Sequence, residues 1–547
     1  MKKIICFFIA ISCLLFSITA QEALKSIEEE YYDFLSLQGL ADRPSLGYRT
    51  LSDSVWIIDD DADHVWKDNS LDSTILLFDV ENPASNLFMD GIEQSLSIRL
   101  YGPRLYTSYN NDFPFGQNDG ALWQGAGFNS SLSAGVRLEG FGFEATFKPQ
   151  ITYSQNKDWD YLTGITNPYG YFSWQLIDIV QRYGDEPFYT YSWGDSEIRW
   201  TWNTLTVGYG TQSPWIGPAW LNPMLGSNNA DPYPKLDVGL RKTPIIIPGL
   251  NWNLGELEVR IWLGRLTQSK YFSGHKDTDR MINMASFSYS PSFIDGFTVG
   301  LNRLFMTYWQ KENLSYMLRL FNFKHKNGTG SGNDEDQKAA LFADWMFPES
   351  GFEVYGEIGI DDFTCYEIAN PFHTGIYTIG VKQYIPIFKS IEGLLNLEWN
   401  GFEMSQDFQL QWQYGGYYYH SFVNQGYTNN GQIVGAGSGA LGNCQTVSFT
   451  IFYPKGKTVV KGQRNSPNVN YILNKAVNST ADDLFDTWYA MYETYFSGGL
   501  ETTYFLTSSF SLSAEANAIF RYFPKYAGLE WDYETSLNLC LGCKYTF

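Results

Sequence analysis

The chain has 547 residues and a formal net charge of −22; 17% of its residues are aromatic and 18% are charged. This negative excess argues against nucleic acid as a partner, because phosphate binding needs a basic surface. A mean hydropathy of −0.26 and 50 glycines suit a membrane β-barrel, in which each strand alternates between an apolar outer face and a polar lumen.

Residues 1–20 are predicted to be a secretory signal peptide. Lys2 and Lys3 form a short positive region, an apolar run extends from residue 4 to residue 18, and Ala20 precedes the polar Gln21. The run is short for a membrane-spanning helix, which needs about 20 apolar residues. We therefore expect export from the cytoplasm and removal of this segment.

Residues 21–90 are predicted to form a helical and loop segment in the periplasm. Tyr31 and Phe34 fall at helical spacing, and Ser26 stands before three glutamates as a typical N-cap. Gly39 then supplies a typical helix stop.

Residues 91–547 are predicted to form a transmembrane antiparallel β-barrel. Apolar residues recur at every second position, as in residues 132–138 and 141–147, which flank a turn at Gly140. Such alternation is typical of half-buried antiparallel strands. No repeat of about 40–50 residues suggests a propeller. One large all-β barrel therefore explains the pattern more simply than several soluble domains.

The last strand carries the sharpest local signal. Counting back by twos from the terminus gives one wholly apolar face: Phe547, Tyr545, Cys543, Leu541, Leu539 and Leu537. A terminal aromatic residue resembles the assembly signal of bacterial outer-membrane proteins. We therefore expect location in the bacterial outer membrane, contact with outer-membrane lipid, and recognition of this strand by the β-barrel assembly machinery.

Catalytic and metal-binding patterns fail on inspection. Residues 437–442 match a glycine-rich dinucleotide motif by letter, but the residues that follow predict a strand and not a helix. Ser438 lacks the flanking glycines of a nucleophile elbow, and the five histidines are widely spread. We expect no enzymatic activity, no cofactor and no metal site.

Four segments resemble the Wzi capsule-assembly family of outer-membrane proteins. They are residues 118–127, 213–236, 345–357 and 419–435, and they occur in the family's order. The resemblance implies a β-barrel of roughly 18 strands with a helical element on the periplasmic side. It also implies a non-enzymatic role, in which the protein binds capsular polysaccharide and holds it on the outer surface.

Three positions depart from the family's pattern. Ala126, Ile216 and the pair Asn429 and Asn430 stand where the pattern often has a basic residue, a second tryptophan and a His-Arg pair. The loss of cations weakens the expectation of an acidic capsule, so the ligand that the resemblance implies is a capsular or other exopolysaccharide whose charge stays open.

Eight residues in these segments are candidate carbohydrate contacts. Sugars stack their C–H faces on aromatic rings and exchange hydrogen bonds with amide side chains. The candidates are Trp123, Gln124, Trp215, Trp220, Asn228, Asn229, His420 and Tyr427. The alternative is that these Trp-Gly-Pro and Asn-Pro elements only fix turns and fill the barrel.

Three functions fit the sequence, of which an adhesin or structural porin-like protein without a small ligand is the third. A Wzi-type surface anchor predicts a lumen obstructed by side chains and inward loops. The same strands would equally build a porin, which is a diffusion channel for small solutes. The negative charge of the chain would then favour the passage of cations.

Overall fold

The computed structural model places most of the chain. The predicted signal peptide and Phe547 lie outside the described residues. These are residues 26–58, 62–69, 74–80, 84, 86, 89, 92–161, 177–272, 278–314, 320, 335–361, 373–403, 405, 416–420, 422–467, 493–524 and 531–546.

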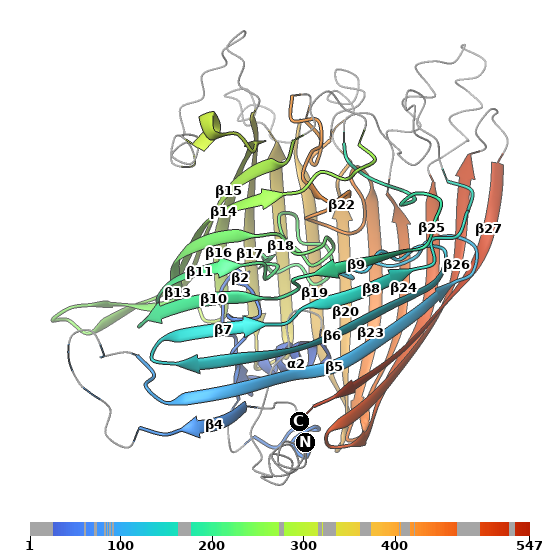
Figure 1. Ribbon diagram of the computed structural model, residues 1–547. Helices are drawn as coiled ribbons and strands as arrows, with labels where there is room; N and C mark the ends of the chain where they lie inside the picture. Colours follow the sequence, from blue (N-terminus) through green and yellow to red (C-terminus); the bar gives the residue numbers. More distant parts are fainter. Residues whose placement is uncertain are drawn as a thin grey trace, which may run out of the picture.

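One antiparallel sheet of 21 strands closes on itself, because β27 pairs with both β26 and β5. β4 pairs only with β5 and lies outside the ring. β7 and β8 pair with successive parts of β6, so these two count as one interrupted strand. β10 pairs with β7 and β9 pairs with β8, so β9 and β10 likewise count as one interrupted strand. The described residues therefore form a closed barrel of 18 strands (21 − 1 − 2), which confirms the predicted fold (Figure 1).

The bounds of the ring strands follow the chain order. They are β5 (Leu96–Asn110), β6 (Gly127–Gly140), β7 (Phe143–Phe147), β8 (Gln150–Ser154), β9 (Phe188–Ser192), β10 (Glu197–Trp202), β11 (Leu205–Gly210), β13 (Lys235–Ile247), β14 (Trp252–Leu266), β15 (Arg280–Pro291), β16 (Phe297–Tyr308), β17 (Glu335–Phe347), β18 (Phe352–Asp361), β19 (Ile376–Phe388), β20 (Ile391–Gly401), β23 (Asn443–Tyr453), β24 (Gly456–Ser466), β25 (Thr494–Thr507), β26 (Phe510–Pro524) and β27 (Trp531–Tyr545).

Shorter elements lie outside the ring. They are α2 (Ile27–Ser36), β1 (Ala41–Asp42), β2 (Tyr48–Arg49), β3 (Ile57–Ile58), β4 (Thr74–Phe78), β12 (Trp215–Ile216), β21 (Thr428–Asn429) and β22 (Gln432–Ile433). Within the described residues, no helix combines the length and the hydropathy that a membrane crossing requires.

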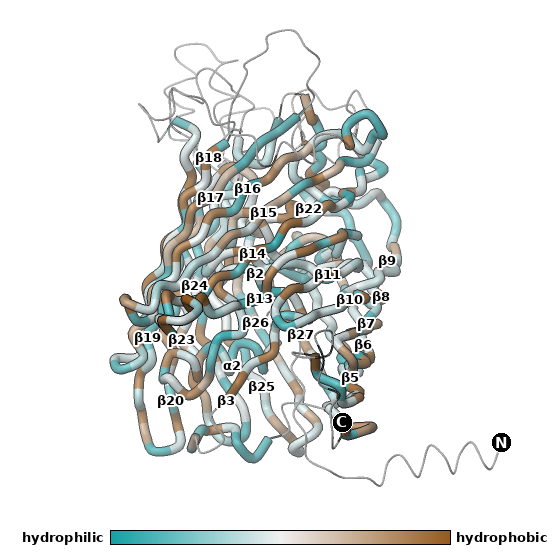
Figure 2. Tube along the Cα trace, turned by 90° about the vertical axis from the view of Figure 1, so that its left-hand side faces the viewer, coloured by the Kyte–Doolittle hydropathy of each residue, from teal (hydrophilic) through white to brown (hydrophobic). Residues whose placement is uncertain are grey.

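The strands alternate as the sequence predicted. On β27, Leu541 is 64% exposed and points outward, whereas its neighbour Cys540 is 5% exposed and points into the lumen. The hydropathy colours alternate along the strands in Figure 2. Because lipid replaces water around the barrel, this apolar outer face is the stable arrangement.

The two ends of the barrel differ. Short turns close one end, such as those at Asn203 and at residues 454–455, while at the other end β8 and β9 are joined by a connection of more than thirty residues, and β11 and β13 by the described residues 211–234. In outer-membrane barrels short turns are periplasmic and long loops extracellular. α2 lies inside the barrel towards the short-turn end (Figure 1).

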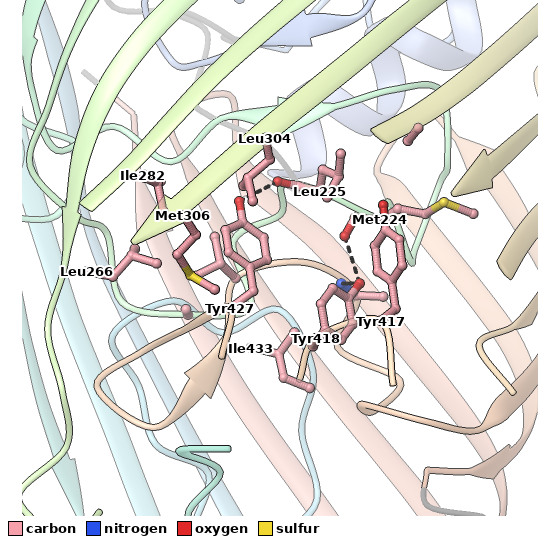
Figure 3. Packing of buried hydrophobic residues seen from close by; sticks show 14 of the residues in the cluster. Met224, Leu225, Leu266, Ile282, Leu304, Met306, Tyr417, Tyr418, Tyr427 and Ile433 are labelled. Carbon is pink, nitrogen blue, oxygen red and sulfur yellow. Dashed lines mark hydrogen bonds between the residues drawn. The ribbon is translucent and has the colours of Figure 1, made fainter. Parts of the chain in front are cut away.

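Three segments fill much of the lumen. We call them the N-terminal segment (residues 26–69), the β11–β13 loop (residues 211–234) and the β20–β23 loop (residues 402–442), of which the described residues were given above. The last two share one buried cluster with wall residues such as Ile282, Leu304 and Met306. In Figure 3 the Tyr418 and Tyr427 hydroxyls reach the β11–β13 loop.

The N-terminal segment is fixed to the wall by rings and ion pairs. Ser26 caps α2 by accepting from the Glu29 N–H at 3.0 Å, which confirms the predicted helix start. Tyr31 stacks on Trp66, and Phe34 stacks on Phe452 of β23. Of the segment expected in the periplasm (residues 21–90), the described part up to residue 69 therefore docks within the lumen, whereas β4 pairs with β5 outside the ring.

Candidate functional site

The β11–β13 loop carries four of the predicted sugar contacts, Trp215, Trp220, Asn228 and Asn229, and wall carboxylates hold it in place. Glu357 of β18 accepts hydrogen bonds from the Ala219 and Met224 N–H groups, each at 3.1 Å. Gly217 has φ +90°, and a Cβ there would lie 2.3 Å from the Glu357 carboxylate. The loop can approach the wall this closely only because residue 217 is glycine.

Glu398 of β20 holds the next turn of the same loop. It accepts from the Leu221 N–H at 2.9 Å, from the Asn222 N–H at 2.8 Å and from the Tyr355 hydroxyl at 2.8 Å. Buried carboxylates are stable when donors surround them in this way. Glu357 and Glu398 were missed by sequence reasoning because nothing in an alternating strand marks which inward glutamate faces a loop.

The two tryptophans of this loop differ in how far their rings are exposed. Trp215 is almost fully buried, its Nε1–H donates to the Ala219 carbonyl at 2.9 Å, and its backbone pairs with Arg49 of β2. Trp220 is only half-buried, and its backbone N–H donates to the Tyr355 hydroxyl. Trp220 therefore has more ring surface available to a ligand than Trp215.

Gln124 and Asn228 lie where the segment at residues 114–124 meets the β11–β13 loop. Gln124 accepts from the Ser108 hydroxyl at 2.6 Å, and its amide donates to the Tyr106 hydroxyl at 3.3 Å. The Asn228 carbonyl accepts from the Gly120 N–H at 2.7 Å. The two segments thus form one layer across the lumen.

A cavity of about 840 Å³ lies beneath this layer, and we call it the chamber. Gln124, Trp215, Trp220 and Asn228 all line it, so the fold brings four of the eight predicted residues to one space.

Three other predicted residues hold the inner loops together. Tyr427 is 0% exposed and its hydroxyl donates to the Leu225 carbonyl, so neither face of its ring is open. Asn229 donates to the Ile433 carbonyl and accepts from the Asn118 N–H. His420 accepts, through Nδ1, from the backbone of residues 422 and 423. In this conformation all three perform the packing and turn-fixing role that was the alternative interpretation.

Trp123 lies at the extracellular end, apart from the chamber. Its ring is 5.3 Å from that of Tyr183, which in turn meets Tyr271 edge-on at 5.1 Å. The exposed Lys270 ammonium lies 4.9 Å from the Tyr271 ring centre. The Tyr183 hydroxyl donates to the Asn430 side chain at 2.5 Å, which ties these rings to the β20–β23 loop.

A second aromatic group continues the same outer end over β14–β16. Arg265 stacks over Trp309 at 5.5 Å and pairs with Asp279. Phe422 is 61% exposed, and its carbonyl accepts from the hydroxyl of Tyr308, the residue before Trp309 in the chain. We define the outer aromatic patch as Tyr183, Tyr271, Trp309 and Phe422, together with the cations Lys270 and Arg265.

A buried acid fixes the loop that carries Lys270 and Tyr271. Asp178 accepts from the Ser269 N–H and from its hydroxyl, each at 2.6 Å. Burial raises the pKa of Asp178, although Arg280 and the two Ser269 donors oppose that shift. Arg280 also donates to the Gly426 carbonyl at 2.7 Å. The same arginine therefore contacts the β20–β23 loop and, through the charge of Asp178, supports the loop that carries Lys270 and Tyr271.

The described residues contain no group of three or more His, Cys, Asp or Glu residues arranged to hold a metal ion. The site therefore consists of aromatic faces, amides and hydroxyls, with cations at its outer rim. This chemistry suits binding of a polyhydroxylated ligand.

The sequence matches the family model of the capsule assembly protein Wzi over residues 105–460, well over half of the chain. The chain belongs to the Wzi family. This match confirms the family that the four sequence segments resembled.

Among solved structures, Escherichia coli Wzi is similar in fold, with a TM-score of 0.57 at 12% identity, covering 97% of this chain and 100% of that chain. That protein is described as an outer-membrane protein of group 1 capsule assembly and a carbohydrate-binding β-barrel. Pseudomonas putida OprB is more distant, with a TM-score of 0.37, 10% identity and coverage of 82% of this chain and 94% of that chain. A Rh. blastica porin variant has a TM-score of 0.31 at 11% identity, covering 83% and 100%. No curated protein sequence matches the chain.

Family membership and the closed barrel place this Wzi-family protein in the bacterial outer membrane. None of the residues of its outer aromatic patch was among the contacts predicted from the sequence. The available signal was an aromatic residue beside a basic one, as in Arg182-Tyr183 and Lys270-Tyr271. These pairs lie nearly ninety residues apart, and only the barrel brings them together.

Proposed function

We propose that this Wzi-family barrel binds a capsular or other exopolysaccharide at its extracellular end and holds it on the cell surface. The match over residues 105–460 carries the proposal, because it assigns the chain to a capsule assembly family. The proposed role makes and breaks no covalent bond, so it needs no catalytic residue or cofactor.

The outer aromatic patch is the contact surface that we propose for the polymer. A long polysaccharide outside the cell reaches the extracellular loops, whereas Tyr427 and Trp215 are covered. Exposed rings such as Phe422 and Trp309 offer apolar faces to sugar C–H groups. Lys270 and Arg265 supply charged hydrogen-bond donors, which would also bind the carboxylates of acidic sugars.

Binding of purified polysaccharide to the detergent-solubilised protein tests the patch. We expect the double variant Tyr271→Ala with Trp309→Ala to bind about thirtyfold more weakly, because each stacked ring contributes about 1 kcal/mol. Trp193→Ala is the matched control, since Trp193 is an exposed aromatic residue that contacts Phe147 on the barrel wall. Equal binding by both variants would remove the patch from the proposal.

Retention of polysaccharide by cells tests the anchoring role. Deleting the gene should move polymer from the cell-associated to the released fraction, and the double patch variant should do so in part. Equal retention in the deletion mutant and the wild type would sink the anchor hypothesis.

A diffusion channel is the competing function, and the lumen contents argue against it. Two loops and the N-terminal segment share buried clusters inside the ring. We therefore expect purified full-length protein to show no large stable openings in planar bilayers. Frequent stable openings, selective for cations, would favour the channel instead.

Two further partners belong to the proposal. Outer-membrane lipid surrounds the apolar face of the barrel, and the β-barrel assembly machinery recognises the last strand, β27, together with the aromatic Phe547 that follows it in the sequence. Deleting Phe547 should lower the amount of protein inserted into the outer membrane, measured by fractionation.

A further inference from the structure

The chamber is a built space inside the barrel, distinct from the outer aromatic patch. The N-terminal segment lies at one end of it, through Glu30 and Asp33, and the β11–β13 loop lies at the other, through Trp215 and Trp220. Its volume of about 840 Å³ falls within the range of small-molecule sites, roughly 300–1,000 Å³.

Three buried polar atoms on its wall have no hydrogen-bond partner among the described residues. They are Asn396 Oδ1, Ser448 Oγ and Thr503 Oγ1, and their residues are 1%, 1% and 0% exposed. All three residues line the chamber, and Asn396 and Ser448 are direct cross-strand partners. A buried polar atom without a partner is costly, so something in the chamber must satisfy these atoms.

The two lysines of β24 that line the chamber are already paired. Lys461 binds Glu515, and Lys457 binds Glu30 and Glu501. An anionic ligand would have to compete with these carboxylates, and a fatty chain would leave Asn396 and Ser448 unsatisfied. A neutral molecule with many hydroxyls and an apolar face satisfies both the amides and the half-buried Trp220 ring.

The chamber reaches solvent at the periplasmic end. Its lining includes Lys242 and Glu256, which pair at 3.1 Å and whose side chains are 26% and 36% exposed. The opposite end is the layer that Glu357 and Glu398 hold in place. A ligand therefore has a route into the chamber from the periplasm.

We propose that the chamber is a second binding site, which takes a neutral sugar unit of one to three residues from the periplasmic side. This inference goes beyond the proposed binding at the extracellular end. The two sites share no residue, so either can fail alone.

Protection of Cys540 tests occupancy in the detergent-solubilised full-length protein. Cys540 lines the chamber, whereas Cys444 is buried and does not line it. We expect a small neutral methanethiosulfonate reagent to label Cys540, measured by mass spectrometry at each cysteine. Neutral di- and trisaccharides (maltose, cellobiose, lactose and maltotriose) should slow that labelling, while glucuronic acid and inorganic phosphate should not.

Two matched variants test the contact itself. Asn396→Leu should weaken protection by the best disaccharide about tenfold, because it removes one buried amide contact. Asn302→Leu is the control, since Asn302 is equally buried and also has an unpartnered Oδ1 among the described residues, yet it does not line the chamber.

Three results would overturn the inference. If the reagent labels neither Cys540 nor an introduced thiol at the half-buried chamber position Ser497 (Ser497→Cys), the chamber is closed to solutes. Labelling that no neutral sugar slows would show a hydrated space only, and stronger protection by the anionic probes would give the wrong ligand class. None of these results affects polysaccharide binding at the outer patch, which the Tyr271 and Trp309 variants report.

Discussion

Inward glutamates of the barrel wall set the conformation of the lumen segments. Glu258 accepts from the Leu46 and Tyr48 N–H groups, as Glu357 and Glu398 do from the β11–β13 loop. A loop in a lumen has no strand partner for its N–H groups, so a carboxylate with two oxygens is an efficient substitute. The sequence shows these glutamates only as polar positions in alternating strands.

Glu398→Gln tests this role at the scale of one residue. The glutamine amide nitrogen cannot accept a hydrogen bond, so at least one of the Leu221 and Asn222 N–H groups loses its acceptor. We expect hydrogen exchange at these two amides to speed up by about tenfold or more, which corresponds to a loss of about 1.5–3 kcal/mol. Glu256→Gln at the partly exposed rim should leave this exchange unchanged; equal acceleration in both variants would contradict the role of Glu398.

The helix α2 shows which features of an element the local sequence predicts and which it does not. Its start at Ser26 follows from the N-cap preference, and Gly39, with φ +70°, follows it as the predicted stop. Its docking does not follow from the sequence: Asp33 pairs with Lys382 of β19 and with Arg43. These partners are separated from the helix by up to 349 residues, so only the closed ring determines the contact.

The docking of α2 should depend on pH through Asp33. Burial opposes ionisation of Asp33, but Lys382 and Arg43 outweigh it and hold the pKa of Asp33 well below its ordinary value. A carboxyl whose pKa is lower in the folded state stabilises that state at neutral pH. This contribution begins to fall below about pH 4 and is lost as the pH drops through the folded-state pKa.

Hydrogen exchange of α2, corrected for its intrinsic pH dependence, measures this effect. Protection should stay constant from neutral pH down to about pH 5 and weaken below about pH 4. Asp33→Asn should lower protection at pH 7 and show a smaller loss on acidification, because the titrating group is gone. Identical pH profiles for the variant and the wild type would contradict the assignment.

Closure of the ring is decided at the scale of the whole molecule. The first and last ring strands, β5 and β27, meet across more than 420 residues of chain. Buried amides bridge this seam: Asn538 donates to Asn110 at 2.7 Å and accepts from Asn517 at 2.7 Å. Matched amides satisfy one another without water, which suits the inner wall of a barrel.

Asn538→Leu should weaken the closed barrel. It leaves polar atoms of Asn110 and Asn517 without their partner, at a cost of about 1–3 kcal/mol each. We expect the folded band in semi-native electrophoresis to convert to the unfolded band at a lower temperature. Asn302→Leu serves as the comparison, since the Asn302 Oδ1 has no partner to lose among the described residues; an equal shift there would show that any buried asparagine has this effect.

The sequence by itself determined the strand alternation, the start of α2, the outward face of β27 and membership of the Wzi family, because these depend on local periodicity, caps and ordered motifs. Only the tertiary structure decided the roles of the candidate residues. Trp220 faces a chamber and Tyr427 is covered, although both are aromatic residues in similar motifs. The physical reason is that side-chain exposure in a lumen depends on which distant wall residues meet each loop, and local sequence does not encode that pairing.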